Sequence, residues 1–170
     1  MVAERNAKPN RLGLHFRPLA LPAGTQAIMT PSSGDTDGPN SVTTTHGIEV
    51  AAKAQLLEQR TDPGERGWIY AYQIRISNVG DRPLTLRTRH WVITDANGER
   101  REVRGPGVVG EQPRLEPGDH FEYQSMAELP TDWGTMEGSF AFAPDEGDLL
   151  DVAVGRFFLA ESATNSILDS

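Results

Sequence analysis

Apolar and polar residues alternate along most of the chain that follows residue 46. Every second residue is apolar from Ile48 to Leu56 and again from Trp68 to Ile76. The same repeat returns, interrupted by one glycine, between Met136 and Phe142. A period of two places successive side chains on opposite faces of a strand. The pattern therefore predicts strands that turn one face to a hydrophobic core and the other to solvent.

The segment 84–94 predicts a strand with an irregularity in it. Leu84 and Leu86 lie on one face together with Val92, whereas Trp91 and Ile93 fall on the other face. One extra residue in a strand reverses the faces of everything that follows it. We therefore expect a β-bulge near 89–91.

The last strand, predicted at 151–160, changes phase in the same way. Val152 and Val154 are in step, and Phe157 and Leu159 are one residue out of step with them. Gly155 stands between the two pairs. A glycine inside a strand often marks a bulge, so we expect one there.

Turn residues separate these strands at intervals of about 8–15 residues. Asp95 to Gly98 has the Asn-Gly dipeptide of a hairpin turn, and Pro63-Gly64 marks another turn. With about seven strands and no convincing helix, the chain is predicted to be all-β, an antiparallel β-sandwich. The segment Leu115 to Tyr123 resembles the corner before strand F of immunoglobulin-like and fibronectin type III-like sandwiches.

The apolar residues are unevenly distributed, which divides the chain into three parts. Residues 1–45 are rich in Pro, Gly, Ser, Thr and Asn and are predicted to be a flexible N-terminal tail. Residues 46–160 form the domain, and residues 161–170 form a C-terminal tail. A short apolar patch at 12–21 either docks on the domain or is non-coding sequence read from an upstream start codon.

Charge and composition exclude several classes of protein. The net charge is −8, which disfavours binding to nucleic acid or to an anionic membrane surface. The chain has no cysteine, so disulfides, thiolate metal sites and cysteine nucleophiles are excluded. No apolar run is long enough for a membrane span or a signal peptide, and we expect a cytoplasmic protein. Basic residues still cluster at 87–89 and 99–104, mainly as exposed strand faces.

Several stretches between about residues 42 and 159 match one protein family closely. These stretches are THGIEV (45–50), YAYQIRISN (70–78), RHWVITDANG (89–98), GPGVVGEQPRLEPGDHFEYQS (105–125) and GTMEGSF (134–140). On them the chain resembles the ApaG family, also called DUF525.

The resemblance implies one fibronectin type III-like sandwich in a bacterial protein. In eukaryotes the same module is fused to F-box proteins and to a polymerase-delta-interacting protein, which implies a role in protein binding. The family is also linked to cobalt and magnesium resistance. In some bacteria its gene neighbours that of a diadenosine tetraphosphate hydrolase.

The glycine pattern at 105–110 matches G-x-G-x-x-G but lacks the context of a dinucleotide site. Such a site follows a buried parallel strand and opens a helix, whereas this loop follows the charged stretch RREVR and precedes Pro113. A plain connection between sheets is one interpretation. The other is an anion-binding nest for a polyphosphate, formed by Arg104, Gly105, Gly107, Gly110 and Arg114.

The residues give no pattern for metal binding or catalysis. The histidines at 15, 46, 90 and 120 are scattered, and we expect neither a dedicated metal site nor a cofactor. The sequence contains no Gly-x-Ser-x-Gly, His-Glu-x-x-His or Walker A motif. We therefore expect a protein that is not an enzyme.

A binding module is the class of function that remains. Trp133 in the loop 129–133 and Asn97 in the turn 95–98 are the candidate interaction residues, because aromatic side chains anchor interfaces. Trp133 has a second interpretation, as a lid folded back on the core. We expect an unknown protein partner. The alternative is a binder or sensor of phosphate-containing small molecules, and the sequence leaves a homodimer open.

Overall fold

The computed structural model describes residues 41–61, 64 and 66–161. Within these ranges the chain forms nine strands and no helix. The strands are β1 (Ser41–Thr45), β2 (Ile48–Arg60), β3 (Gly67–Asn78), β4 (Leu84–Asp95), β5 (Arg100–Pro106), β6 (Arg114–Leu115), β7 (His120–Leu129), β8 (Gly134–Pro144) and β9 (Leu150–Leu159). The predicted tail up to residue 40, its apolar patch and residues 162–170 lie outside the described residues.

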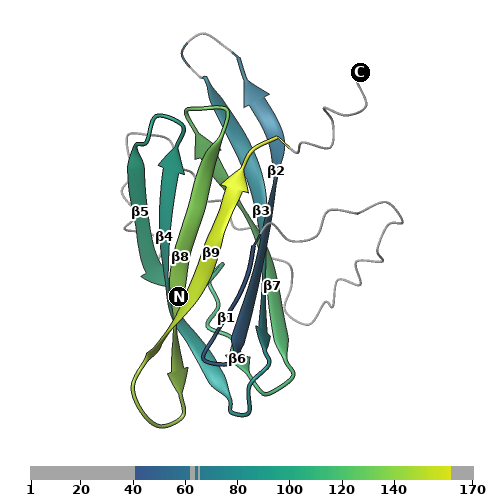
Figure 1. The fold of residues 1–170 in the computed structure, drawn as a ribbon, viewed down its shortest axis with the longest axis vertical. Helices are drawn as coiled ribbons and strands as arrows, with labels where there is room; N and C mark the ends of the chain where they lie inside the picture. The colour runs from purple at the N-terminus through teal and green to yellow at the C-terminus, as the bar shows by residue number, and fades with distance from the viewer. Residues whose placement is uncertain (1–40, 62–63, 65, 162–170) are drawn as a thin grey trace, which may run out of the picture.

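The strands form two antiparallel sheets packed face to face. One sheet has the order β1-β2-β3-β7, and the other has the order β5-β4-β8-β9 with β6 also paired to β4. Figure 1 shows the two layers with their strands nearly aligned. The predicted all-β sandwich is confirmed. The prediction of about seven strands omitted β1 and β6. No candidate membrane-spanning helix occurs in the described part of the chain.

The inward-facing residues of both sheets meet in one core. Trp91 lies at its centre and packs edge-on against Tyr72, Phe140 and Phe157, with ring centroids 5.9, 5.6 and 6.1 Å away. Edge-to-face contacts of this kind add to the stabilisation from burial. The alternation read from the sequence thus places the aromatic side chains that hold the two sheets together.

The first strand begins earlier than the predicted domain boundary at residue 46. Ser41–Thr45 pairs with β2, so residues 41–45, assigned to the tail from sequence, are part of the sheet. Their hydroxyl-bearing side chains alternate toward β9: the Ser41 hydroxyl donates to the Gly155 carbonyl (2.9 Å) and that of Thr43 to the Ala153 carbonyl (2.8 Å). These bonds close one side of the sandwich.

Both expected bulges are present, one of them displaced. In β9 the register with β8 shifts between Met136 and Gly138, which leaves Gly155 and Arg156 opposite one residue, as expected. In β4 the shift falls between Leu86 and Thr88. The extra residue is therefore Arg87, before the predicted 89–91, because Trp91 and Ile93 already alternate regularly in the core.

The corner at 115–119 is held by a buried asparagine. Asn78, only 2% exposed, donates from Nδ2 to the carbonyls of Leu115 (2.9 Å) and Arg82 (2.8 Å), and its Oδ1 accepts from the Gly80 amide. The corner leads into β7, which lies beside β3. The Tyr123 hydroxyl is buried without a hydrogen-bond partner in the described structure.

Candidate functional site

Two connections at one end of the sandwich bring the predicted interaction residues together. The β4–β5 turn (95–99) carries Asn97, and the β7–β8 loop (130–133) carries Trp133. The Ala96 amide donates to the Thr131 hydroxyl at 3.0 Å and joins the two connections. We call these residues, 95–99 and 130–133, the loop end. Both connections lie at the upper end of the molecule in Figure 1.

A buried carboxylate fixes the β4–β5 turn. Asp95 is 7% exposed, and its Oδ1 accepts from the amides of Asn97 (2.9 Å) and Glu99 (3.0 Å). The Gly98 amide also donates to the Asp95 carbonyl at 3.0 Å. This confirms the predicted hairpin turn, and it leaves the Asn97 side chain exposed at the tip.

The β7–β8 loop is held just as firmly, yet Trp133 stands out of it. The Tyr70 hydroxyl donates to the Asp132 carbonyl, and the Thr131 hydroxyl donates to the Trp133 carbonyl at 2.7 Å. Burial, followed by the charges of Asp132 and Glu161, raises the pKa of Tyr70 to about 12, so it donates as a neutral phenol. Trp133 itself is 45% exposed, which is too much for a lid on the core.

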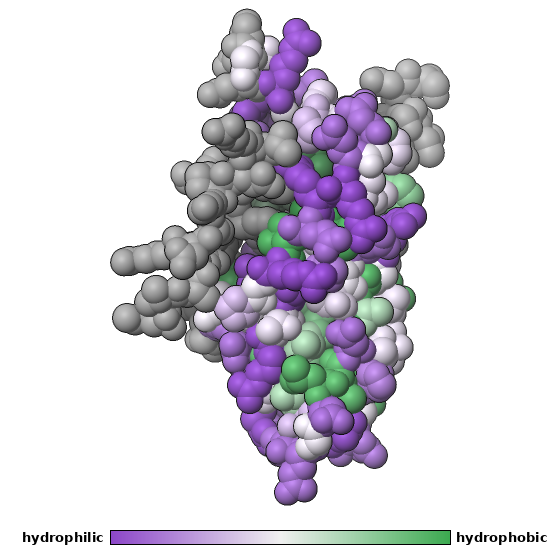
Figure 2. Space-filling view, turned by 90° about the vertical axis from the view of Figure 1, so that its left-hand side faces the viewer, coloured by the Kyte–Doolittle hydropathy of each residue, from purple (hydrophilic) through white to green (hydrophobic). Residues whose placement is uncertain are grey.

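A second exposed aromatic residue lies near the loop end on β9. Phe158 is 57% exposed and pairs with Thr135, two residues after Trp133 in sequence. The remaining surface here is mainly polar. Figure 2 views the side on which β5 lies in Figure 1 and shows hydrophilic side chains with smaller apolar areas between them.

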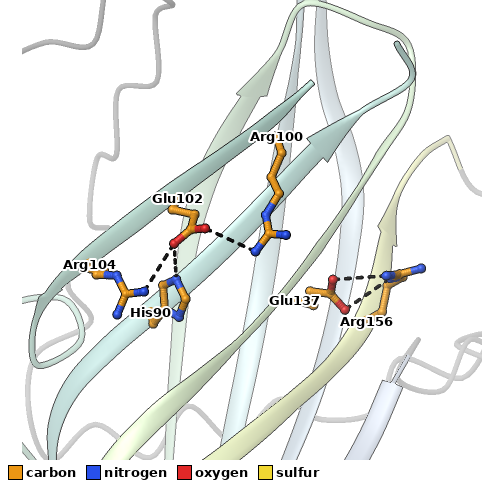
Figure 3. A network of polar contacts seen from close by, with 6 residues as sticks. All are labelled: His90, Arg100, Glu102, Arg104, Glu137 and Arg156. Atoms are coloured by element: carbon orange, nitrogen blue, oxygen red, sulfur yellow. Dashed lines mark hydrogen bonds and ion pairs between the residues drawn. The ribbon is translucent and has the colours of Figure 1, made fainter. Parts of the chain in front are cut away.

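The outer face of β5 and β4 carries an ion-pair network next to the loop end (Figure 3). The Glu102 carboxylate pairs with His90 (2.9 Å), Arg100 (3.2 Å) and Arg104 (3.3 Å). The hydrogen bond from His90 is the largest cause of a lowered Glu102 pKa, and the two arginines lower it further. Two arginines around one carboxylate leave this local patch net positive on an acidic chain.

The network continues across the sheet over a buried valine. Val92 lies between Glu102 on β5 and Glu137 on β8 in the strand register and is 7% exposed. Arg156 on β9 pairs with Glu137 at 3.1 Å. The charged side chains on this face are thus paired with one another and cover an apolar position beneath them.

The glycine loop has the geometry of a tight connection. The Gly107 amide donates to the Arg87 carbonyl (2.8 Å), and Val108 and Glu111 exchange backbone hydrogen bonds (2.8 and 2.9 Å). Gly107 and Gly110 have φ of +60° and +79°, and a Cβ on Gly107 would lie 2.3 Å from the Glu111 carbonyl oxygen. The amides of Gly107 and Val108, within the 105–110 loop of the proposed nest, are therefore already used within the protein.

The two arginines expected beside the nest are not brought together. Arg104 lies opposite His90 and Arg114 opposite Thr85, about 16 Å apart along β4 at the usual rise per residue. Arg104 pairs with Glu102, and Arg114 makes a bidentate pair with Asp145. These contacts leave the arginines engaged with carboxylates of their own chain.

The Arg89 side chain contacts the loop, a contact that the sequence pattern did not predict. Its Nη1 donates to the carbonyls of Pro106 and Gly107, both at 2.9 Å, and its guanidinium fills the space beside Gly105, where a Cβ would lie 3.2 Å from Nη2. Because the bulge at Arg87 reverses the faces of β4, Arg89 falls on the core-facing side with Trp91. It supplies donors to carbonyls and so fixes the loop.

The rest of the described surface offers weaker candidates for a functional site. No group of three or more His, Asp or Glu side chains that could hold a metal ion occurs in the ranges described. A shallow depression of about 600 Å³ lies over the outer face of β3, lined in part by Arg75, Ser77 and His120. Arg75 there pairs with Glu122 at 3.3 Å.

Known proteins with a related sequence share this domain. The chain matches the family described as the ApaG domain over residues 58–144. It is 44% identical to the protein ApaG of Anaeromyxobacter dehalogenans over 117 residues, 69% of this chain and 92% of that protein. It is 47% identical to the protein ApaG of Paramagnetospirillum magneticum over 116 residues, 68% of this chain and 89% of that protein.

Two solved structures are similar in both sequence and fold. An X-ray structure of a structural genomics target has a TM-score of 0.66 and 37% identity, covering 69% of this chain and 89% of its own. A crystal structure from Bordetella pertussis has a TM-score of 0.64 and 39% identity, covering 68% of this chain and 94% of its own.

Proposed function

The chain belongs to the ApaG domain family, and we propose that it is a non-catalytic protein-binding module whose partner contacts the loop end around Trp133. The observation that carries the proposal is an exposed tryptophan on a loop that three hydrogen bonds hold in place. Tryptophan is enriched among the residues that dominate binding energy.

The rigidity of the loop end favours binding. Ordering a mobile loop on association costs free energy, and a loop that is already ordered avoids most of that cost. The bonds from Tyr70 and Ala96 tie the Trp133 loop to the neighbouring strand and turn before any partner arrives. Little further conformational entropy is then lost when the partner fixes the indole ring.

The surroundings of Trp133 supply the rest of an interface. Phe158 adds apolar area, and Arg100, which follows the β4–β5 turn, adds charge at the margin. An apolar centre with a polar rim is the usual composition of a protein interface. The Asp95 carboxylate is occupied by two backbone amides, so it holds the turn in place.

The test compares two exposed apolar residues at opposite ends of the sandwich. Trp133→Ala should weaken partner binding by at least about tenfold, as for an interface anchor. Leu149→Ala is the matched control, because Leu149 is 60% exposed in the β8–β9 turn at the other end. Affinity capture from bacterial cytosol identifies partners, and calorimetry with each purified partner gives the affinities.

Stability separates an interface role from a core role. Trp133→Ala should change the melting temperature by only a few degrees, since the ring is half exposed. A loss of many degrees, or equal binding by the Trp133→Ala and Leu149→Ala variants, would contradict the proposal.

Polyphosphate binding at residues 105–110 is the alternative function, and it can be tested on the same purified protein. It requires Arg104 to leave Glu102 and the loop amides to exchange their internal partners for phosphate. A thermal shift with pyrophosphate or a nucleotide polyphosphate that disappears in Arg104→Ala would favour this alternative.

A further inference from the structure

The strand β7 forms an edge of its sheet that no other described strand covers. It pairs with β3 on one side through ten consecutive residue pairs without a register shift. It contains neither proline nor glycine, and its central residues, Gln124 to Ala127, are uncharged. Long regular edges of this kind are prone to pair with another strand.

The remaining edges are protected. β1 and β9 lie against each other through hydroxyl-to-carbonyl bonds. β5 is short, carries Arg100, Glu102 and Arg104 on its outer face, and ends at Pro106. Charges and prolines are the usual means by which proteins block edge pairing. Among the described strands β7 is therefore the exception.

The backbone of β7 presents its even-numbered residues outward. The Asp119 carbonyl accepts from the Asn78 amide of β3, which fixes the odd-numbered residues as those turned toward β3. The Glu128 carbonyl accepts from Arg101 of β5, on the opposite side (3.3 Å). In an antiparallel strand the N–H and C=O of one residue point the same way. The amides and carbonyls of Glu122, Gln124 and Met126 therefore point away from the sheet.

We propose that two copies of this chain associate through their β7 strands, antiparallel and centred on Gln124. In this register Gln124 faces the same residue of the second copy, and Glu122 faces Met126. Each of the three outward residues then exchanges two backbone hydrogen bonds, about six in all. Two four-stranded sheets become one continuous sheet.

The side chains select this register over its neighbours. Centring on Ser125 would place Glu122 opposite the second copy's Glu128, and facing like charges are destabilising. Centring on Tyr123 would leave Glu128 and the C-terminal end of β7 unpaired. The register at Gln124 instead sets His120 opposite Glu128. Glu122 and Glu128 already pair with Arg75 and Arg60 of their own chain.

The contact is small, so the association should be weak. One strand pair buries less than the roughly 1,200 Å² of a standard stable interface. We expect a dimer that forms at micromolar or higher concentration. This inference does not depend on the role of Trp133, which lies in the loop beyond the end of β7. The Trp133→Ala variant should dimerise like the parent chain.

Cysteine cross-linking tests the register directly, because the chain has no cysteine of its own. Residues in a hydrogen-bonded antiparallel pair have Cα atoms about 5.5 Å apart, which suits a disulfide. In the full chain, Gln124→Cys should form a linked dimer on mild oxidation at least about tenfold faster than Glu122→Cys. Asp148→Cys, in the exposed β8–β9 turn, reports random collisions.

Proline substitution tests the edge itself. Met126→Pro removes an outward N–H without removing a bond to β3, so the fold should persist while the dimer is lost. Met126→Val keeps the N–H and should sediment as the parent chain does. Equal cross-linking at the three cysteine positions, or a monomer by sedimentation velocity at several hundred micromolar (about a hundredfold above micromolar affinity), would overturn the proposal.

Discussion

At the scale of single residues, two buried polar side chains differ in whether their polar groups are hydrogen-bonded. Asn78 satisfies its donors and its acceptor within the connections it joins. The Tyr123 hydroxyl is equally buried and has no partner in the described structure. Burial without a hydrogen bond is costly, so the two residues should respond differently to the loss of their polar groups.

Replacing each residue should show this difference. Asn78→Ala should lower the free energy of unfolding by about 2–4 kcal/mol, because it removes three hydrogen bonds from a buried corner. Tyr123→Phe should change it by less than about 1 kcal/mol, in either direction. Urea unfolding measures both. A large loss in Tyr123→Phe would mean that the hydroxyl has a partner after all.

At the scale of elements, alternation predicted the long strands well because each has one buried face. It missed β1, whose Ser and Thr side chains bond to β9 and carry little apolar signal. It also misplaced the β4 bulge. Sequence gives the phase on either side of a bulge but leaves the position of the extra residue open. Because the bulge lies at Arg87, the Arg89 side chain points inward and donates a hydrogen bond to the glycine loop.

The join between β1 and β9 depends on the absence of a side chain at Gly155. A Cβ there would lie 2.7 Å from the Thr43 Cγ2 atom. Gly155→Ala should therefore push β1 away, lower stability by about 1–3 kcal/mol and speed amide exchange in 41–45.

A second substitution identifies the clash as the cause. Thr43→Ser removes the methyl group and keeps the hydroxyl, so it should restore most of the stability lost in Gly155→Ala. Hydrogen exchange and urea unfolding of the single and double variants measure the rescue. If Thr43→Ser gives no rescue, the strand is held by something other than this contact.

At the scale of the whole molecule, the sequence supplied the candidate residues and the topology decided which of them meet. Asn97 and Trp133 are 36 positions apart, and they share one end because β4–β5 and β7–β8 both turn there. Arg104 and Arg114 are closer in sequence, yet β5 and β6 place them at different points along β4. Spacing along a chain does not report such distances.

The tyrosines offer a probe of the whole fold. All three in the chain are buried, and burial raises the pKa of Tyr70 and of Tyr72 to about 12 and that of Tyr123 above its usual value. The folded state therefore keeps these protons at a pH where the unfolded chain, with a pKa of about 10, releases them. Their contribution to stability is complete below about pH 10 and is lost as the pH rises toward 12.

An alkaline titration should therefore show one cooperative event. Little phenolate absorbance should appear near pH 10, and it should then rise together with the loss of the circular dichroism signal of the strands. A tyrosine that ionises near pH 10 while the sheet signal is intact would contradict the burial of that side chain.

The side-chain bonds between β1 and β9 also bear on how the protein responds to force. β1 is the first described strand. A force applied to the chain upstream of it therefore acts on Ser41, at the open end of the β1–β2 hairpin. Bonds loaded from one end break one after another, so β1 should peel away at low tension. The core strands β2 to β9 would stay folded. Under tension on the upstream chain, β1 would then detach first, and this would limit the force that reaches the rest of the sandwich.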